Sequence, residues 1–158
     1  MSGDEKEAGV SASYPALVRL GFTGTRYGMT PAQMAKVDDI VSFEVTEVHH
    51  GDCVGADHDI HRIAKTSGIP TVVHPPSDQR LRAFTDGDTV LDPKEYLARN
   101  RDIVDSTDML LATPMETSPQ PKGGTWYTIR YARSQGKRVV IVWPSGKAEA
   151  LASDEAKS

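Results

Sequence analysis

The stretch GFTGTRYGMTPAQ (residues 21–33) lies where an apolar segment gives way to the start of a helix. The residues before it, ALVRLGF (16–22), predict a short buried strand. Thr30 is placed to cap the following helix and Gln33 to close a capping box, with a proline at the first helical position. Glycines, hydroxyl groups and an arginine, Arg26, fill the turn between strand and helix. This strand–turn–helix unit predicts an α/β fold.

The rest of the chain alternates in the same way. Further strands are predicted at 45–51, 69–76, 109–113 and 137–144, and helices at 30–43, 55–68, 93–108 and 125–136. Residues 77–93 have no clear period and are predicted to be a long loop. The fold class is therefore predicted to be α/β, a Rossmann-like three-layer domain with a parallel sheet of about five strands and helices on both faces.

Composition limits the possible classes of protein. The 158 residues are 38% hydrophobic, which suits one globular domain, predicted at 14–146 between disordered tails at 1–13 and 147–158. The chain has no apolar run long enough to cross a membrane. The polar first residues predict no secretory signal, and the single cysteine, Cys53, excludes an internal disulfide. We expect a cytoplasmic protein.

The charge of the chain gives little attraction for nucleic acid. The net charge is −4, and three of these negative charges fall in the two predicted tails. The remaining domain is nearly neutral, so we expect neither nucleic acid nor a membrane as a partner. A small basic pocket remains compatible with this balance.

Three predicted strands run into turns rich in small or polar residues: GFTGTR (21–26), HHGDCVGAD (49–57) and, after a proline-rich loop, KGGTWYT (122–128). Each turn leads to a helix N-terminus, where free backbone N–H groups favour phosphate. In a parallel sheet, such turns meet at the carboxyl ends of the strands. We therefore expect the backbone amides of 24–25, 52–55 and 123–125 to hold a phosphate or a ribose.

These segments resemble the Smf/DprA–LOG (SLOG) superfamily of Rossmann-like proteins over about residues 17–144. The second turn follows its pattern G-x-D-x-x-x-H-x-x-A at Gly55, Asp57, His61 and Ala64. RNRDIVDSTDMLLATP (99–114) is similar to the helix and strand before the family's second glycine site. The resemblance implies a nucleotide-like ligand at the switch point of the sheet and a homodimer or higher homo-oligomer.

The chain departs from the signature of the LOG branch, P-G-G-x-G-T followed by two glutamates. Lys122 replaces the proline, and no carboxylate lies at 128–130. A hydrolase that cleaves N-glycosidic bonds needs a carboxylate, and Asp52, Asp86, Asp88 and Glu116 are the candidates to replace it. The first hypothesis is a module that binds, senses or sequesters a nucleotide-derived phosphate. The alternative is a LOG-like nucleoside-monophosphate phosphoribohydrolase in which Asp52 or Glu116 is catalytic.

The predicted ligand-binding residues come from all three turns and from the helix at 93–108, where the resemblance implies roles for two of them. They are Thr23, Gly24, Thr25, Arg26, Gly51, Asp52, Gly55, Asp57, Asn100, Arg101, Gly123, Gly124, Thr125, Trp126 and Thr128. Asp57 also suits a helix cap, and Trp126 suits either core packing or stacking on a base.

All five histidines lie between 49 and 74, but their spacing matches no metal-ligand motif. We expect no metal and no cofactor, and we interpret Cys53 as an inert buried thiol.

Overall fold

The computed structural model of the chain describes residues 18–43 and 45–152. Twelve elements follow one another along the chain. They are β1 (Val18–Gly24), α2 (Pro31–Val41), β2 (Val45–His50), α3 (Ala56–Thr66), β3 (Thr71–Val73), the 3-10 turn η1 (Gln79–Leu81), β4 (Thr89–Val90), α4 (Tyr96–Asp105), β5 (Met109–Thr113), α5 (Gly124–Ser134), β6 (Arg138–Val142) and β7 (Ala148–Leu151). The capping box predicted for the first of these helices is present, because Thr30 and Gln33 each accept the other's backbone N–H.

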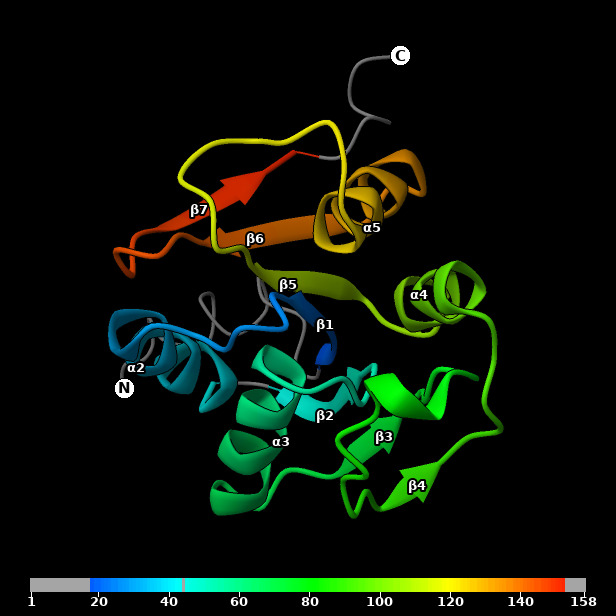
Figure 1. Cartoon of the computed structure of the whole chain (residues 1–158). Helices are drawn as coiled ribbons and strands as arrows, with labels where there is room; N and C mark the ends of the chain where they lie inside the picture. The colour runs from blue at the N-terminus through cyan, green and yellow to red at the C-terminus, as the bar shows by residue number, and fades with distance from the viewer. Residues whose placement is uncertain (1–17, 44, 153–158) are drawn as a thin grey trace.

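The strands form one sheet in the order β4-β3-β2-β1-β5-β6-β7 (Figure 1). All neighbouring strands are parallel except β6 and β7. From β1 the chain moves outward to β4 and then returns to place β5 on the other side of β1. The strand order therefore reverses between β1 and β5, and ligands of open α/β sheets bind beyond the carboxyl ends of such strands.

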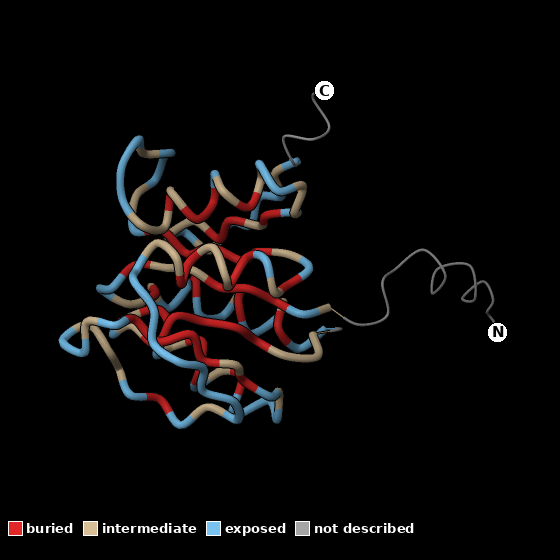
Figure 2. Tube along the Cα trace, turned by 90° about the vertical axis from the view of Figure 1, so that its right-hand side faces the viewer, coloured by how far each residue is buried: buried red, intermediate tan, exposed pale blue. Residues whose placement is uncertain are grey.

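Two apolar cores lie on opposite faces of the sheet. On one face, α2 and α3 pack over Leu20, Phe22 and Val48. On the other, residues of α4 and α5 pack over Leu110 and Ile141. Buried segments run through the middle of the molecule and exposed ones surround them (Figure 2). The predicted three-layer Rossmann-like architecture is confirmed.

The sheet has seven strands in place of the five predicted. The first addition, β4, is a two-residue exposed edge strand inside the stretch 77–93, too short to leave a periodic pattern. The second, β7, lies in the predicted disordered tail 147–158, and this prediction is wrong for Ala148–Leu151. A tight turn at Gly146 brings β7 back against β6, and the exposure of its side chains explains why the segment looks like a tail in the sequence.

The predicted tail at 1–13 lies outside the described residues, as do 153–158. Within the described part of the chain, no helix is both long and apolar enough to cross a membrane.

Candidate functional site

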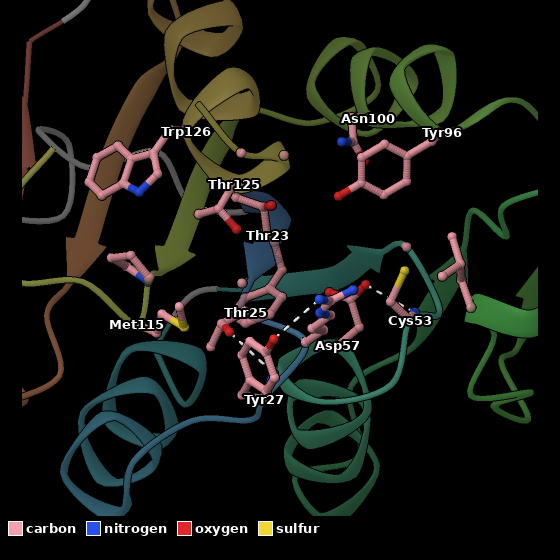
Figure 3. A pocket seen from close by; sticks show the side chains of 18 of the residues that line it. Thr23, Thr25, Tyr27, Cys53, Asp57, Tyr96, Asn100, Met115, Thr125 and Trp126 are labelled. Carbon is pink, nitrogen blue, oxygen red and sulfur yellow. Dashed lines mark hydrogen bonds between the residues drawn. The ribbon is translucent and has the colours of Figure 1, made fainter. Parts of the chain in front are cut away.

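A pocket of about 480 Å³ opens beyond the carboxyl ends of β1 and β5. Its size falls within the range of small-molecule sites, about 300–1,000 Å³. Figure 3 shows Thr23 at its centre, Thr125 and Trp126 from α5 and Tyr96 and Asn100 from α4 on one side, and residues of the first two turns on the other. The pocket therefore lies at the switch point of the sheet.

Eleven of the fifteen predicted ligand-binding residues line this pocket, and so does Glu116, one of the two predicted catalytic residues. The eleven are Thr23, Gly24, Thr25, Arg26, Gly51, Asp57, Asn100, Gly123, Gly124, Thr125 and Trp126. Asp52, Gly55, Arg101 and Thr128 are not among the lining residues. The three turns do converge on one cavity, although their backbone amides are not equally available.

The turn before α5 has free donors. Gly123 is the N-cap of α5 and supplies no side-chain cap. The amides of Gly124, Thr125 and Trp126 have no hydrogen-bond partner among the described residues. A helix begins with such orphan N–H groups and carries partial positive charge there. This corner of the pocket can therefore receive an anion.

The turn before α3 is closed. The amide of Cys53 donates to Asp57 Oδ2 over 3.1 Å, and the nearby Gly51 amide also favours the ionised form of the Asp57 carboxylate. The amides of Asp52 and Val54 donate to His50 Nδ1 (3.0 Å) and to the carbonyl of Leu81 (3.2 Å). The expectation that amides 52–55 hold a phosphate is therefore wrong for 52–54, because the protein's own groups occupy them.

Asp57 lies at the base of this closed turn and is 8% exposed. Burial raises the pKa of its carboxyl to about 6, although the nearby Arg99 guanidinium and the two amides act in the opposite direction. It is a pocket-lining carboxyl that titrates near neutral pH, which suits a general acid or base.

The turn after β1 offers side chains more than amides. The Thr25 amide donates to the carbonyl of Thr113 over 3.2 Å, so the expected role of this amide in phosphate binding is also wrong. The Thr23 hydroxyl has no partner among residues 18–43 and 45–152. The exposed Arg26 guanidinium donates to the Tyr27 hydroxyl and lies over the Tyr27 ring, and it pairs with no carboxylate of the described residues. Gly55, at φ +94°, lets the second turn approach the backbone of Arg26.

Asp52 is a structural anchor rather than a catalytic residue. Its fully buried carboxylate binds Arg82 Nε (2.7 Å), the Thr85 amide (2.9 Å) and the Thr85 hydroxyl (2.8 Å). Burial alone would raise the pKa of this carboxyl, but the hydrogen bonds from Thr85 and the Arg82 ion pair together lower it. Asp52 thus ties the stretch 77–93 to the second turn, and Leu81 from this stretch lines the pocket.

The other predicted residues outside the pocket have structural contacts. Arg101 donates to the Tyr127 hydroxyl (2.9 Å) on the α4–α5 side. The Thr128 hydroxyl donates to the carbonyl of Gly124 (2.7 Å) inside α5. Neither side chain reaches the cavity, so the structure does not support a ligand contact for them.

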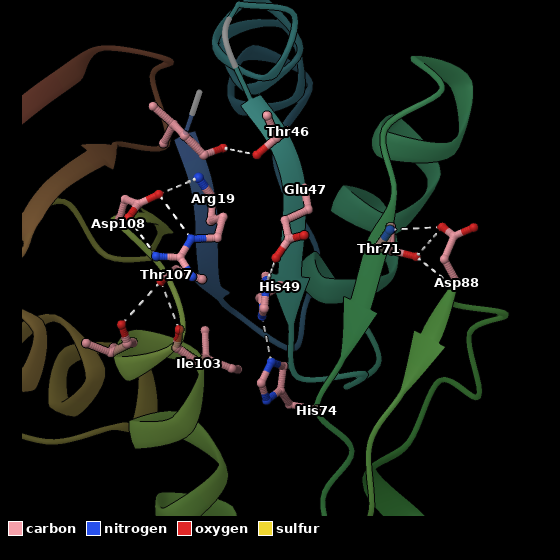
Figure 4. Close-up of polar contacts among 12 residues, drawn as sticks. Arg19, Thr46, Glu47, His49, Thr71, His74, Asp88, Ile103, Thr107 and Asp108 are labelled. Atoms are coloured by element: carbon pink, nitrogen blue, oxygen red, sulfur yellow. Dashed lines mark hydrogen bonds and ion pairs between the residues drawn. The ribbon is translucent and has the colours of Figure 1, made fainter. Parts of the chain in front are cut away.

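Two alternative carboxylates also lie away from the pocket. Asp86 pairs with His61 Nε2 (3.0 Å) and with Lys65 (3.4 Å). Asp88 accepts the Thr71 amide over 2.9 Å on the strand beside it, as Figure 4 shows. Asp57 and Glu116 are therefore the carboxylates that line the cavity among the described residues.

Arg99 is a pocket residue that the sequence reasoning missed. Its side chain is 2% exposed and donates to the carbonyls of Gly51 and His74 and to the Asn100 side chain. Arg99 and Asn100 belong to the buried face of α4, together with Ile103. The helical spacing of these positions from Ile103 was the signal that could have found Arg99.

The rim of the pocket is apolar and aromatic. Tyr27, Val54, Tyr96 and Met115 all line the cavity and are between 38% and 69% exposed. Exposed aromatic and thioether groups around a cavity suit the face of a planar ring.

Cys53 is half-buried and lines the pocket, whereas we expected a buried thiol. Burial and the nearby Asp57 raise its pKa, which keeps it in the unreactive thiol form.

The histidines mostly bind one another. His49 Nδ1 and His74 Nε2 lie 2.8 Å apart, and His49 Nε2 lies 2.6 Å from Glu47 (Figure 4). His50 Nε2 pairs with His61 Nδ1 at 2.9 Å. The described residues hold no group of three His, Cys, Asp or Glu side chains arranged to bind a metal.

Comparison with known proteins identifies the fold. No model of a protein family matches the chain, and no curated protein matches it in sequence. Among solved structures, it is similar to the molybdenum cofactor binding protein from the phototrophic bacterium Rippkaea orientalis, with a TM-score of 0.63 and 19% identity over 80% of this chain and 77% of that one. The chain therefore shares its fold with this cofactor binding protein.

A second similar structure is DNA processing protein A (DprA) from Streptococcus pneumoniae, with a TM-score of 0.61 and 20% identity. The match covers 79% of this chain and 50% of the DprA chain, so this protein spans about half of DprA. The predicted resemblance is confirmed at the level of the fold.

Proposed function

We propose that this protein is a cytoplasmic module that binds a nucleotide or nucleotide-derived phosphate in the pocket at the ends of β1 and β5. The observation that carries the proposal is the set of amides at Gly124, Thr125 and Trp126, which have no partner among the described residues and belong to residues that line that cavity. They supply an anion site at a helix N-terminus.

Side chains around this corner complement the amides. The Thr23 hydroxyl and the Arg26 guanidinium line the same cavity, and an arginine can bind phosphate with two hydrogen bonds. Lys122 lines it as well and pairs with no carboxylate of the described residues. The aromatic rim offers faces on which a base or another planar ring can stack. The structural neighbour from Rippkaea orientalis is a molybdenum cofactor binding protein, which supports a small-molecule ligand for this fold.

A second candidate function is hydrolysis of an N-glycosidic bond in a nucleoside monophosphate. Asp57 favours it, because a pocket carboxyl with a pKa of about 6 suits proton transfer. The second carboxylate would be Glu116. Asp52, which binds Arg82 and Thr85 outside the cavity, no longer takes part in this alternative.

The test is calorimetry with mono-, di- and cyclic nucleotides, with mass spectrometry of whatever purifies with the protein. Arg26→Ala should weaken binding about tenfold, since a charge-assisted contact is lost. Arg101→Ala is the matched control and should bind like the wild type, because Arg101 lies outside the cavity. No binding of any nucleotide and no co-purified phosphate compound would overturn the proposal.

The two candidate functions differ in the fate of the ligand. A binding module returns the ligand intact when the complex is denatured, whereas the hydrolase releases free base. Loss of base release in both Asp57→Asn and Glu116→Gln, measured at saturating ligand, would favour the hydrolase. We also propose a homodimer or higher homo-oligomer, which light scattering tests directly.

A further inference from the structure

Glu116 is an anomaly in a pocket that otherwise suits an anion. It lies in the loop between β5 and α5 and lines the cavity. One carboxylate oxygen, Oε1, accepts the indole N–H of Trp126 over 3.0 Å. The other oxygen has no hydrogen-bond partner, and no cation pairs with the carboxylate, within the described part of the chain. A ligand that carries only a phosphate and acceptor groups would be repelled here.

The anomaly disappears if one end of the ligand carries N–H donors. We infer that Glu116 recognises the edge of a 2-amino-4-oxo ring, the donor pattern shared by guanine and pterins, on a ligand whose phosphate occupies the α5 corner. This inference rests on the proposed function.

The donor pattern of such a ring explains the choice. A ring N–H and the neighbouring amino group of this edge can both donate to an ionised carboxylate, which only accepts. Adenine places an acceptor nitrogen beside its amino group, so a carboxylate facing its pairing edge meets one donor and one repulsive lone pair. Glu116 should therefore both favour the 2-amino-4-oxo ring and disfavour adenine.

Trp126 acts as the positioning residue for Glu116. Its side chain is 4% exposed, and its ring packs 5.9 Å from the ring of Trp143. The indole N–H is therefore fixed before any ligand arrives, and it holds the carboxylate in one orientation. Preorganisation of this kind increases the selectivity of a binding group.

The chain contains a matched pair for control experiments. Trp143 Nε1 donates to Glu149 Oε1 over 2.9 Å, which is the same indole–carboxylate contact. Neither Trp143 nor Glu149 lines the pocket. Glu149→Gln therefore removes the same type of charge from the same type of partner without touching the cavity.

The experiment measures calorimetric affinities of the full chain for GMP, IMP and AMP, which differ in the groups on this edge. The wild type should bind GMP at least about tenfold more tightly than AMP, with IMP between them, because IMP lacks the 2-amino group. Glu116→Gln should weaken GMP binding about tenfold and change AMP binding less than about twofold. Glu149→Gln should reproduce the wild type.

A Trp126 variant and a pterin ligand extend these affinity measurements. Trp126→Phe should reduce the GMP/AMP ratio, an effect that a merely structural role would not produce because it would weaken both nucleotides alike. Neopterin monophosphate, a pterin with a phosphate, distinguishes the two sources of the ring. Tighter binding of the pterin than of GMP assigns the site to pterins, and the reverse assigns it to guanine nucleotides.

The outcomes separate this inference from the proposed function. Equal affinity for GMP and AMP in the wild type, or a GMP preference that survives in Glu116→Gln, overturns the inference and leaves the proposed function intact. Absence of binding for every nucleotide and for the pterin overturns both.

Discussion

The turns before α3 and α5 occupy equivalent positions, each between a strand and the helix that follows it, but they differ in whether their backbone amides are already hydrogen-bonded. Both are glycine-rich, both begin with a positive-φ glycine N-cap without a side-chain cap, and both face the same pocket. In the turn before α3, the Asp57 carboxylate already accepts the nearby amides. In the turn before α5, the amides of Gly124, Thr125 and Trp126 have no partner in the part of the chain that the structure describes. A helix N-terminus is thus a ligand site only where the chain does not supply its own anion.

The turn before α3 (residues 51–55, the closed turn) and the turn before α5 (residues 122–126, the open turn) therefore have different roles. The closed turn fixes the position of the stretch 77–93 through Asp52 and supports one wall of the pocket through Leu81. The open turn keeps its donors for a ligand. Changes at the closed turn should therefore affect stability, and changes at the open turn should affect binding.

Removal of the Asp52 carboxylate should have the largest effect. Asp52→Ala leaves the Arg82 guanidinium, whose side chain is 14% exposed, without its partner and leaves the Thr85 amide unsatisfied. Loss of one partner of a buried pair typically lowers the free energy of unfolding by about 3–5 kcal/mol. Urea denaturation at pH 7 measures this change.

Asp78→Ala is the control for this variant, since the Asp78–Arg80 pair is a surface ion pair in the same stretch. Exposed pairs contribute little, so its denaturation midpoint should stay close to that of the wild type. Equal midpoints for Asp52→Ala and Asp78→Ala would mean that something other than Asp52 holds the stretch 77–93.

The glycines of the two turns should respond differently to the same substitution. A Cβ at Gly55 would overlap the backbone of Arg26, and its φ of +94° is strained for any other residue. A Cβ at Gly124 would overlap the Tyr96 hydroxyl, which is the far end of a side chain. Gly55→Ala should therefore destabilise the fold, whereas Gly124→Ala should leave the fold stable and weaken ligand binding about tenfold, as Tyr96 moves into the cavity.

A second substitution checks the physical reason. Tyr96→Ala in the Gly124→Ala background removes the overlap and should restore part of the affinity, measured with the tightest nucleotide of the panel. If the Gly124→Ala variant were as unstable as the Gly55→Ala variant, the two turns would not differ in their roles in stability and binding.

The sequence was sufficient for the architecture and for the cavity that most of the predicted residues line. The alternation of apolar strands with capped helices predicted the layers, and the rule for parallel sheets placed the three turns together. The sequence could not show which backbone amides already donate to other groups of the protein. The role of Asp52 depends on Arg82 and Thr85, about thirty positions away in the chain, and no local pattern marks that contact.

Other misses have a different cause. The family resemblance implied a ligand contact for Arg101, but Arg101 is not part of the buried face of α4 that Ile103 defines, and it binds the Tyr127 hydroxyl. Arg99 and Asn100 share the buried face with Ile103, so helical periodicity, applied to charged residues as well as to apolar ones, would have separated them from Arg101. Strand β7 was not predicted, because its mostly exposed residues show no alternation of apolar and polar side chains.

The smallest expected effect is electrostatic: the charge of Asp57, at the base of the closed turn, should change the affinity of the pocket for an anion. Burial raises the pKa of Asp57 to about 6, so this carboxyl is ionised at pH 8 and mostly protonated at pH 5. An ionised Asp57 in the pocket wall repels an anion, and its protonation removes the repulsion. Anion binding should therefore become stronger as the pH falls, by less than about tenfold even for a dianion, because water screens charges across an open pocket.

Sulfate is the suitable probe, because its own charge does not change between pH 5 and pH 8. Competition of sulfate against a bound nucleotide, measured at both pH values, gives its affinity. Asp57→Asn should remove the dependence and bind sulfate at pH 8 as the wild type does at pH 5. If wild-type sulfate binding weakened toward acid pH, or if Asp57→Asn kept the full dependence, the Asp57 charge would not act on the open turn, and the two turns would be electrostatically independent.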